Sequence, residues 1–432
     1  MHLTDLNIPD LLLSIWRGVI KGSVADPKEY PWAVLQGDVW TAHGQQVQQA
    51  ATYLPGFFDR SPRNIAEKIS SGYKAAEFHT YLWNYAPAML RHLLPPLCWQ
   101  HLCKTAKSVQ ILHHENILLA ELIKAKKLLQ EATRECEEVY VERDIDRMHF
   151  VRPCLHTLWH APDEIFRRGS LICCTQHAME RLIGNLGGEI KQPSNPYHNL
   201  SERAVLRCQT NALKAMIPEL DRVATKAKTL PRGAEDLGNG FILLRALDSC
   251  PRAVSELEAR AFHRYFLAAY PTFVSEINRN DFTFKAHRWA RLRLPNGLVA
   301  RSAWKECNKP LSKLRLARCV KFVNSNGDSE VGEVRYFCQA GPDRRAVAMV
   351  SVFGARDAQL YKDSYETIEL MEYRGEADMR VVEVKDIKTV VGMIPDVMPA
   401  ESTYGTDYKH LHEGCKYFVV EKLGLQVGVL VG

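Results

Sequence analysis

The spacing of apolar residues changes near Trp289, and this change constrains the fold more than any other feature of the chain. Before it, apolar side chains recur at steps of three and four, most clearly in a predicted helix from about Ile111 to Tyr140. After it, they recur at steps of two in short runs separated by Gly, Asn and Asp. The pattern predicts an α+β protein with an α-rich amino part followed by an antiparallel β barrel.

The same change sets the expected domain boundaries. We expect an α-rich part over residues 1–225, a linker with helices over 226–284, and an SH3-like β-barrel module over 285–432 that folds independently. Within the module, Asn296-Gly297 stands between two alternating runs, which predicts a β hairpin.

Composition places the chain among ordinary globular proteins, because 46% of its 432 residues are apolar and 25% are charged. No apolar run is long enough to predict a transmembrane helix. The amino end lacks the features of a signal peptide. The 12 cysteines include no C-x-x-C pair, so we expect reduced thiols in the cytosol or nucleus.

The segment Met148–Asp221 is rich in polar residues that could carry chemistry. His156, His160 and Glu164 have the four-residue spacing that places metal ligands on one helical face. Pro162 interrupts that face, and the first histidine is not followed by the Glu of zinc proteases. Buried or capping histidines are therefore the preferred interpretation.

Two further groups follow in the same segment. Cys173, Cys174 and His177 could form a Cys–His nucleophile pair, although three such residues on a short apolar segment are more often buried. Glu180 has apolar neighbours, so its carboxylate needs a cation. Arg181 or a metal ion could supply it, and spacing alone favours an ion pair with Arg181.

Long sequence blocks in and around this segment resemble a known family. They include MER-x-IGNLG-x-EI-x-QPSNPY-x-NLSERA and Q-x-NALKAMIPEL, the upstream block YLPGFFDRSPRNIAEKISSGYKAAEF, and the downstream block RLRLPNGLVARSAWKE. Over nearly its whole length, the chain resembles the carboxyl-terminal part of fungal DNA transposases of the CACTA-like and Plavaka-type (KDZ-related) group.

The resemblance implies the end of an RNase-H-like domain with its helical insertion. It also implies an Asp-Asp-Glu triad that holds two Mg²⁺ ions for phosphodiester chemistry. Glu180 matches the triad glutamate, which would be both catalytic and metal-binding, and Arg181 follows it. DNA and a full-length transposase are the implied partners, with a nuclear location and neither a membrane nor a small-molecule cofactor.

The chain departs from the family where the two triad Asp residues should stand, because these positions would fall before Met1. Asp10, Asp59, Asp144 and Asp146 have plainer interpretations as helix-start, turn and ion-paired surface charges. One carboxylate cannot hold two metal ions. We therefore expect a truncated, transposase-derived protein that neither binds Mg²⁺ nor cleaves DNA by itself.

Two alternatives stay open. One is an active Asp-Asp-Glu transposase whose true start lies upstream, or whose Asp residues come from another chain. The other is a non-enzymatic chromatin or protein-interaction module, since small β barrels carry many functions.

The net charge of +6 is unevenly distributed, because Lys285–Lys321 contains eleven basic residues and one acid, Glu306. Basic side chains on a β hairpin can follow phosphates, and tryptophan can stack on bases. The alternative is a solvated face with Trp289 and Trp304 in the core. We expect weak DNA contact without sequence preference from Arg288, Arg291, Arg293, Arg301, Lys305, Arg315, Arg318 and Lys321.

Overall fold

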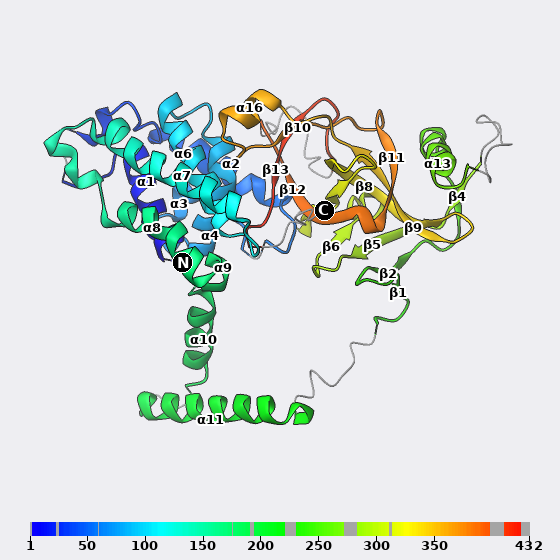
Figure 1. Ribbon diagram of the computed structural model, residues 1–432, viewed down its shortest axis with the longest axis horizontal. Helices are drawn as coiled ribbons and strands as arrows, with labels where there is room; N and C mark the ends of the chain where they lie inside the picture. The colour runs from blue at the N-terminus through cyan, green and yellow to red at the C-terminus, as the bar shows by residue number, and fades with distance from the viewer. Residues whose placement is uncertain are drawn as a thin grey trace.

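The chain is a mixed α+β protein, as its apolar spacing predicts. The computed structural model describes residues 2–22, 26–58, 60–174, 176–190, 194–220, 230–271, 283–310, 313–397 and 410–424. Most helices lie on one side of the molecule and the strands on the other, with two helices set apart from both (Figure 1). Within these ranges, no helix is both long and apolar enough to cross a membrane.

We call residues 2–174 the helical region. Its α-helices are α1 (Ile8–Trp16), α2 (Gly37–Gln49), α3 (Ile65–Lys68), α4 (Ala75–Thr80), α5 (Ala86–Met89), α6 (Pro96–Leu112), α7 (Leu119–Cys136), α8 (Pro153–Arg168) and α9 (Leu171–Cys174). Three π-helical turns join them: η1 (Leu3–Asn7), η4 (Tyr81–Tyr85) and η5 (Glu137–Val141). Prolines stand in the first turn of α1, α6 and α8, where a missing backbone N–H leaves no hydrogen bond unmade.

The predicted helix from Ile111 to Tyr140 is two helices. α6 ends at Leu112, and α7 begins seven residues later and packs along α6. The apolar spacing continues across the break because Ile111 and Ile117 both contact the same core. Periodicity therefore located the buried face correctly and the helix boundary incorrectly.

Two helices, which we call the arm, follow the helical region. α10 (His177–Gly188) leads away from it, and α11 (Pro196–Met216) lies at the far end (Figure 1). No described residue of α11 is buried. The arm is therefore the one long helical segment of the described chain whose apolar side chains have no core to enter.

The carboxyl part is built on an antiparallel sheet of 11 strands. Its longest path runs β1-β2-β5-β8-β7-β12-β13-β10, while β6 pairs with β5, β9 with β8, and β11 with β9. The strands are β1 (Glu235–Asp236), β2 (Ile242–Leu247), β5 (Trp289–Arg293), β6 (Val299–Arg301), β7 (Cys319–Val323), β8 (Ser329–Ala340), β9 (Arg345–Val352), β10 (Leu370–Glu372), β11 (Met379–Glu383), β12 (Ile387–Pro395) and β13 (Lys416–Val420). The expected final strand, residues 425–431, lies outside the described residues.

The expectation of a β barrel is wrong, because the sheet is open in the described part of the chain. Its path ends at β1 on one side and β10 on the other, and these two strands do not pair. Side chains of β10 and β13 pack against the helical region. The outer edge of β10 accepts hydrogen bonds from the Gly354 and Asp357 N–H groups of the segment that follows β9. An RNase-H-like fold for the amino part stays a prediction.

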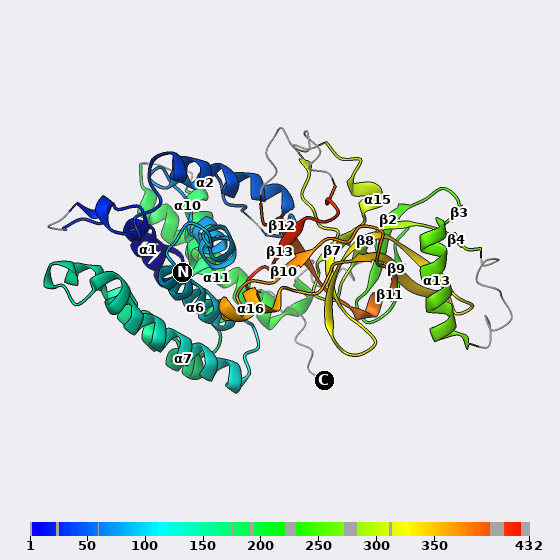
Figure 2. The ribbon, with the colours of Figure 1, turned by 90° about the horizontal axis from the view of Figure 1, so that it is seen from above.

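Shorter elements complete the sheet region. α13 (Glu256–Ala269) begins with a capping box at Ser255 and Glu258 and buries Phe262 and Phe266 against β8, β9 and β11. β3 (Arg252–Ala253) and β4 (Lys285–Ala286) form a separate two-stranded ladder. α15 (Ala303–Glu306) and α16 (Ala358–Asp363) lie in connections between strands. Figure 2 shows α13 at the end of the sheet opposite the helical region.

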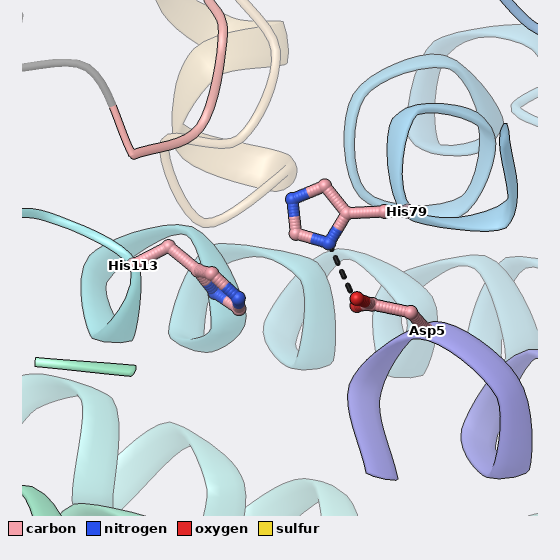
Figure 3. Close-up of side chains that lie close together, drawn as sticks. All are labelled: Asp5, His79 and His113. Atoms are coloured by element: carbon pink, nitrogen blue, oxygen red, sulfur yellow. Dashed lines mark hydrogen bonds and ion pairs between the residues drawn. The ribbon is translucent and has the colours of Figure 1, made fainter. Parts of the chain in front are cut away.

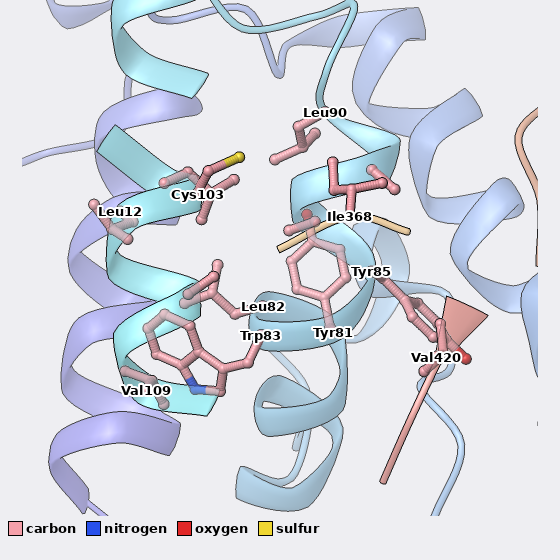
Figure 4. Packing of buried hydrophobic residues seen from close by; sticks show 14 of the residues in the cluster. Leu12, Tyr81, Leu82, Trp83, Tyr85, Leu90, Cys103, Val109, Ile368 and Val420 are labelled. Carbon is pink, nitrogen blue, oxygen red and sulfur yellow. The ribbon is translucent and has the colours of Figure 1, made fainter. Parts of the chain in front are cut away.

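One hydrophobic cluster extends from the helical region into the sheet. Figure 4 shows part of it, with Tyr81 and Tyr85 of η4 gathered with Ile368 and with Val420 of β13. All four are almost fully buried. The helices and the end of the sheet therefore share one core.

Polar contacts cross the same boundary. The Leu316 N–H donates to the Thr52 carbonyl at 3.0 Å. Arg91 donates to both carboxylate oxygens of Asp396, at 3.0 and 3.1 Å. A Cβ at Gly392 of β12 would lie 2.9 Å from Leu54 Cδ2 and 3.2 Å from the Tyr53 carbonyl oxygen, so a larger residue would require these neighbours to shift.

Candidate functional site

Three of the eight basic residues predicted to contact DNA share one face of the β5–β6 hairpin. Arg291 pairs directly with Arg301 across the two strands, and Arg293 follows Arg291 at the two-residue spacing of one strand face. We call Arg291, Arg293 and Arg301 the arginine face. The hairpin is as predicted, and Gly297 adopts φ +82 at its turn.

The arginine face has few neutralising partners. Arg291 is exposed and donates to the Arg245 carbonyl at 2.5 Å. Arg301 lies 3.8 Å from the Glu306 carboxylate. Like charges directly opposite on paired strands repel, so this face favours an anion beside it.

Arg288 and Lys305 lie beside aromatic rings. The Arg288 guanidinium lies 4.8 Å from the centre of the Tyr336 ring and lines a cavity of about 290 Å³. Lys305 is exposed and lies 4.3 Å from the centre of the Trp304 ring. Trp304 is half-buried, whereas Trp289 is a core residue.

The other three basic residues point inward. Arg315 donates to the Ala51 carbonyl and the Ser61 hydroxyl of the helical region. Lys321 binds Glu421 at 2.7 Å and Glu369 at 3.5 Å. Burial opposes the positive charge of Lys321, but these two carboxylates raise its pKa.

Arg318 belongs to a buried network of charges. It is fully buried, and its Nε lies 2.6 Å from Glu333. Glu333 also accepts hydrogen bonds from Arg335 and from the Tyr373 hydroxyl. Arg318 therefore offers no surface to a phosphate and serves the core of the sheet region instead.

Glu306 lies beside this network, but burial and the attraction of nearby positive charges affect its carboxylate in a different proportion. Its carboxylate accepts a hydrogen bond from the Ala317 N–H at 3.1 Å. Burial raises the pKa of Glu306 to about 7, because desolvation outweighs the attraction of Arg318. The one acid in the basic segment is therefore a buried group that titrates near neutrality.

Glu180 lies exposed on α10 of the arm. Among the residues that the structure describes, it belongs to no group of three His, Cys, Asp or Glu side chains close enough to hold an ion. The described residues therefore do not fit a two-ion Mg²⁺ site at this position. The side chains of Arg181, Cys173, Cys174 and His177 lie outside the described residues.

His156 and His160 are exposed on α8, so the prediction that they are buried or capping is wrong. Their Nε2 atoms lie 3.3 Å apart, but Glu164 turns away to pair with Arg167 and Arg168. The helix continues through Pro162. Two histidines without a third ligand make a weak metal site at most.

Asp10 and Asp144 have the plain roles expected of them. Asp10 is in the first turn of α1 and pairs with Arg152. Asp144 caps a short 3₁₀ turn by accepting from the Asp146 N–H, and it also pairs with Arg147. Asp59 lies outside the described residues.

The closest grouping of potential ligands is one that sequence reasoning missed. Asp5 of η1, His79 of α4 and His113 at the end of α6 place one ligand atom each within 4.8 Å of one another (Figure 3). The Asp5 carboxylate is 2.7 Å from His79 Nδ1. The three residues are separated by 74 and 34 positions, so no motif spacing marks them.

Comparisons with known proteins identify no relative. No family model matches the chain, and neither the curated proteins nor the solved structures include a significant match. Function must therefore be argued from the residues themselves.

Proposed function

We propose that this chain is a transposase-derived, DNA-contacting protein that does not cleave strands by itself. The observation that carries the proposal is the direct pairing of Arg291 with Arg301 across β5 and β6. Two guanidinium groups held opposite each other cost folding energy unless an anion lies beside them. DNA phosphates are such anions, and Arg binds them with two parallel hydrogen bonds.

The proposal of an inactive enzyme rests on the surroundings of Glu180. Cleavage by two metal ions requires several carboxylates that converge on the ions. Glu180 is exposed on the arm, and no convergent ligand group includes it among the described residues. The resemblance to transposases supplies the DNA substrate class, and the arginine face supplies the contact.

DNA binding can be tested by titrating labelled duplex with the purified full chain at several salt concentrations. Three phosphate contacts give a slope of about −2.7 in log affinity against log salt, or about 40-fold weaker binding at 200 mM than at 50 mM salt. Replacing Arg291, Arg293 and Arg301 together with Gln should remove most of that slope. The control replaces Arg167, Arg168 and Lys385, which are exposed elsewhere, and should leave the slope unchanged.

Two results would overturn the proposal. One is an unchanged slope in the arginine-face variant. The other is nicking of supercoiled plasmid by the wild-type chain with Mg²⁺ or Mn²⁺ that is lost in Glu180→Gln.

A second candidate function, partner binding, is favoured by the arm. At 100° per residue, the exposed Val205, Leu206, Leu213 and Met216 of α11 fall within an arc of about 100°, the width of a stripe that normally faces a core. Residues 176–220, which include the arm, contain four acids and five bases, so two arms can approach with little net repulsion. We propose a second copy of this chain as the occupant of this stripe.

Light scattering coupled to gel filtration of the full chain tests this assembly. The wild type should form dimers as concentration rises, and Leu206→Asn with Leu213→Asn should stay monomeric. Ile145→Asn, at an exposed position of the helical region, is the control and should still dimerise. A wild type that is monomeric at every concentration would exclude the assembly.

A further inference from the structure

The best-formed ligand cluster of the described chain lies inside the helical region, away from the arm and the arginine face. Asp5, His79 and His113 come from η1, α4 and the end of α6. Asp5 is 2% exposed and His113 is 9% exposed, while His79 keeps some access to solvent. Figure 3 shows the three side chains converging from these separate elements.

We propose that Asp5, His79 and His113 form a binding site for one divalent transition-metal ion of the zinc class. Imidazole nitrogens with one carboxylate oxygen are a donor set that Zn²⁺ and Co²⁺ accept, whereas Mg²⁺ prefers an all-oxygen shell. Three protein ligands leave the fourth tetrahedral position for water or another small ligand.

The hydrogen bonds around the cluster orient its ligands for a metal. His113 Nδ1 lies 2.8 Å from the Val109 carbonyl, which can only accept, so Nδ1 carries the proton. Nε2 of the neutral ring then has a free lone pair. A backbone carbonyl that fixes the tautomer in this way is a usual partner of a metal-binding histidine.

The carboxylate is oriented as well. The Thr4 hydroxyl donates to Asp5 at 2.7 Å, and the Trp83 indole N–H donates to the Thr4 carbonyl at 3.0 Å. These bonds fix η1 against η4 and leave the Asp5 carboxylate directed at His79. A π-helical turn such as η1 often occurs at functional sites.

Binding an ion would require the Asp5 and His79 ligand atoms to move apart from 2.7 Å and the more widely separated ligand atoms to move closer. Zn²⁺ binds nitrogen and oxygen at about 2.0–2.2 Å, so its tetrahedral ligand atoms lie about 3.4 Å apart. The three ligand atoms lie within 4.8 Å of one another, and the Asp5–His79 hydrogen bond would be replaced by two bonds to the ion. The ion would join three helical elements that are distant in sequence.

The test uses the full chain after treatment with a chelator. Zn²⁺ affinity is measured by competition with a chromophoric chelator, and Co²⁺ is added separately to record its visible spectrum. We expect one tight equivalent and the bands of four-coordinate Co²⁺ without a thiolate charge-transfer band, because no cysteine belongs to the site. Saturating Zn²⁺ should raise Tm by roughly 5 °C at a hundredfold excess over Kd.

Matched variants separate this site from adventitious binding. Asp5→Asn keeps the size of the side chain, and His113→Phe keeps a ring; each should weaken Zn²⁺ binding by at least about 100-fold, since each removes a ligand rather than an outer partner. Thr4→Val should weaken it by about tenfold. His156→Ala with His160→Ala, the exposed pair on α8, should bind like the wild type.

Circular dichroism without metal identifies any variant that fails to fold, and the remaining variants then decide the outcome. Absence of a tight equivalent in the wild type would overturn the proposal. So would binding that survives in Asp5→Asn and His113→Phe, or binding that is lost in the His156 and His160 variant.

Discussion

The helical region and the sheet region bury polar groups in opposite chemical states. His43 and His101 are buried among helices, and burial lowers the pKa of each to about 4, so both rings are neutral near pH 7. The sheet region instead buries Arg318 against Glu333. A histidine can lose its proton when it is buried, whereas arginine cannot and must bring a partner charge with it.

Glu77, like Asp5 and Lys104, departs from this pattern in the helical region. It is fully buried, but Arg60 and Arg63, which pair with it, reach solvent. Its ion pairs are therefore screened on one side, whereas Arg318 and Glu333 are both inside. The comparison shows that burial alone does not decide the charge state; the chemistry of the buried group does.

The buried histidines of the helical region and Glu306 of the sheet region should contribute to the pH dependence of stability with opposite signs. A lowered histidine pKa means that the unfolded chain binds more protons below pH 6.5, so stability is lost as pH falls from 6.5 toward 4. The raised pKa of Glu306 means that the folded chain binds more protons between 4.5 and about 7. Stability from Glu306 is therefore lost as pH rises through that window.

The largest expected effect comes from breaking the buried pair. Glu333→Gln leaves the Arg318 guanidinium fully buried without its main counter-charge, and we expect the free energy of unfolding to fall by about 3–5 kcal/mol. Urea denaturation at pH 7 measures it. Glu330→Gln is the control, because its partner Arg380 is 41% exposed, and it should cost less than about 1 kcal/mol. Equal losses in the two variants would contradict the distinction.

The second-largest expected effect tests the pH dependence of stability in the sheet region. Glu306→Gln keeps an acceptor for the Ala317 N–H but cannot ionise. Relative to wild type, the variant should gain about 3 kcal/mol in unfolding free energy between pH 4.5 and pH 8, because only the wild type must ionise a buried carboxyl. Denaturation at a series of pH values checks this, with the exposed Glu256→Gln as control. Parallel pH curves for wild type and Glu306→Gln would rule out the buried carboxyl as the cause.

The smallest effect belongs to the helical region. His101→Phe keeps an aromatic ring beside Tyr140 but removes the imidazole, which must stay neutral when it is buried. Between pH 7.5 and pH 5, the wild type should lose about 2 kcal/mol of stability that the variant does not lose. His156→Phe, at an exposed ring on α8, should follow the wild type. If both variants lose stability equally, buried neutral histidines do not set the acid limit.

Local features of the fold could be predicted because they depend on neighbours in sequence. The two-residue period and Asn296-Gly297 located the β5–β6 hairpin and placed Arg291 and Arg301 near each other. The barrel could not be judged in this way, because closure depends on whether strands far apart in the sequence, such as β1 and β10, come together.

The candidate site, like the fold, could be predicted from the sequence only in part. Charge density identified the basic segment, but Arg318 was expected at the surface because its partner, Glu333, lies on the neighbouring strand. The Asp5 cluster has no sequence signal, since tertiary packing alone brings its three members together. Neither the Asp5 cluster nor the pairing of Arg318 with Glu333 could be predicted from a motif, because each depends on tertiary packing.

The position of β13 beside the helical core has a consequence for synthesis of the chain. Val420 packs near Tyr85. The core of the helical region is therefore incomplete until the last described strand has left the ribosome. At about 5–20 residues per second, the roughly 300 residues between α6 and β13 take roughly 15–60 s to synthesise. During that interval the nascent helices cannot bury all of the apolar surface that the completed chain buries.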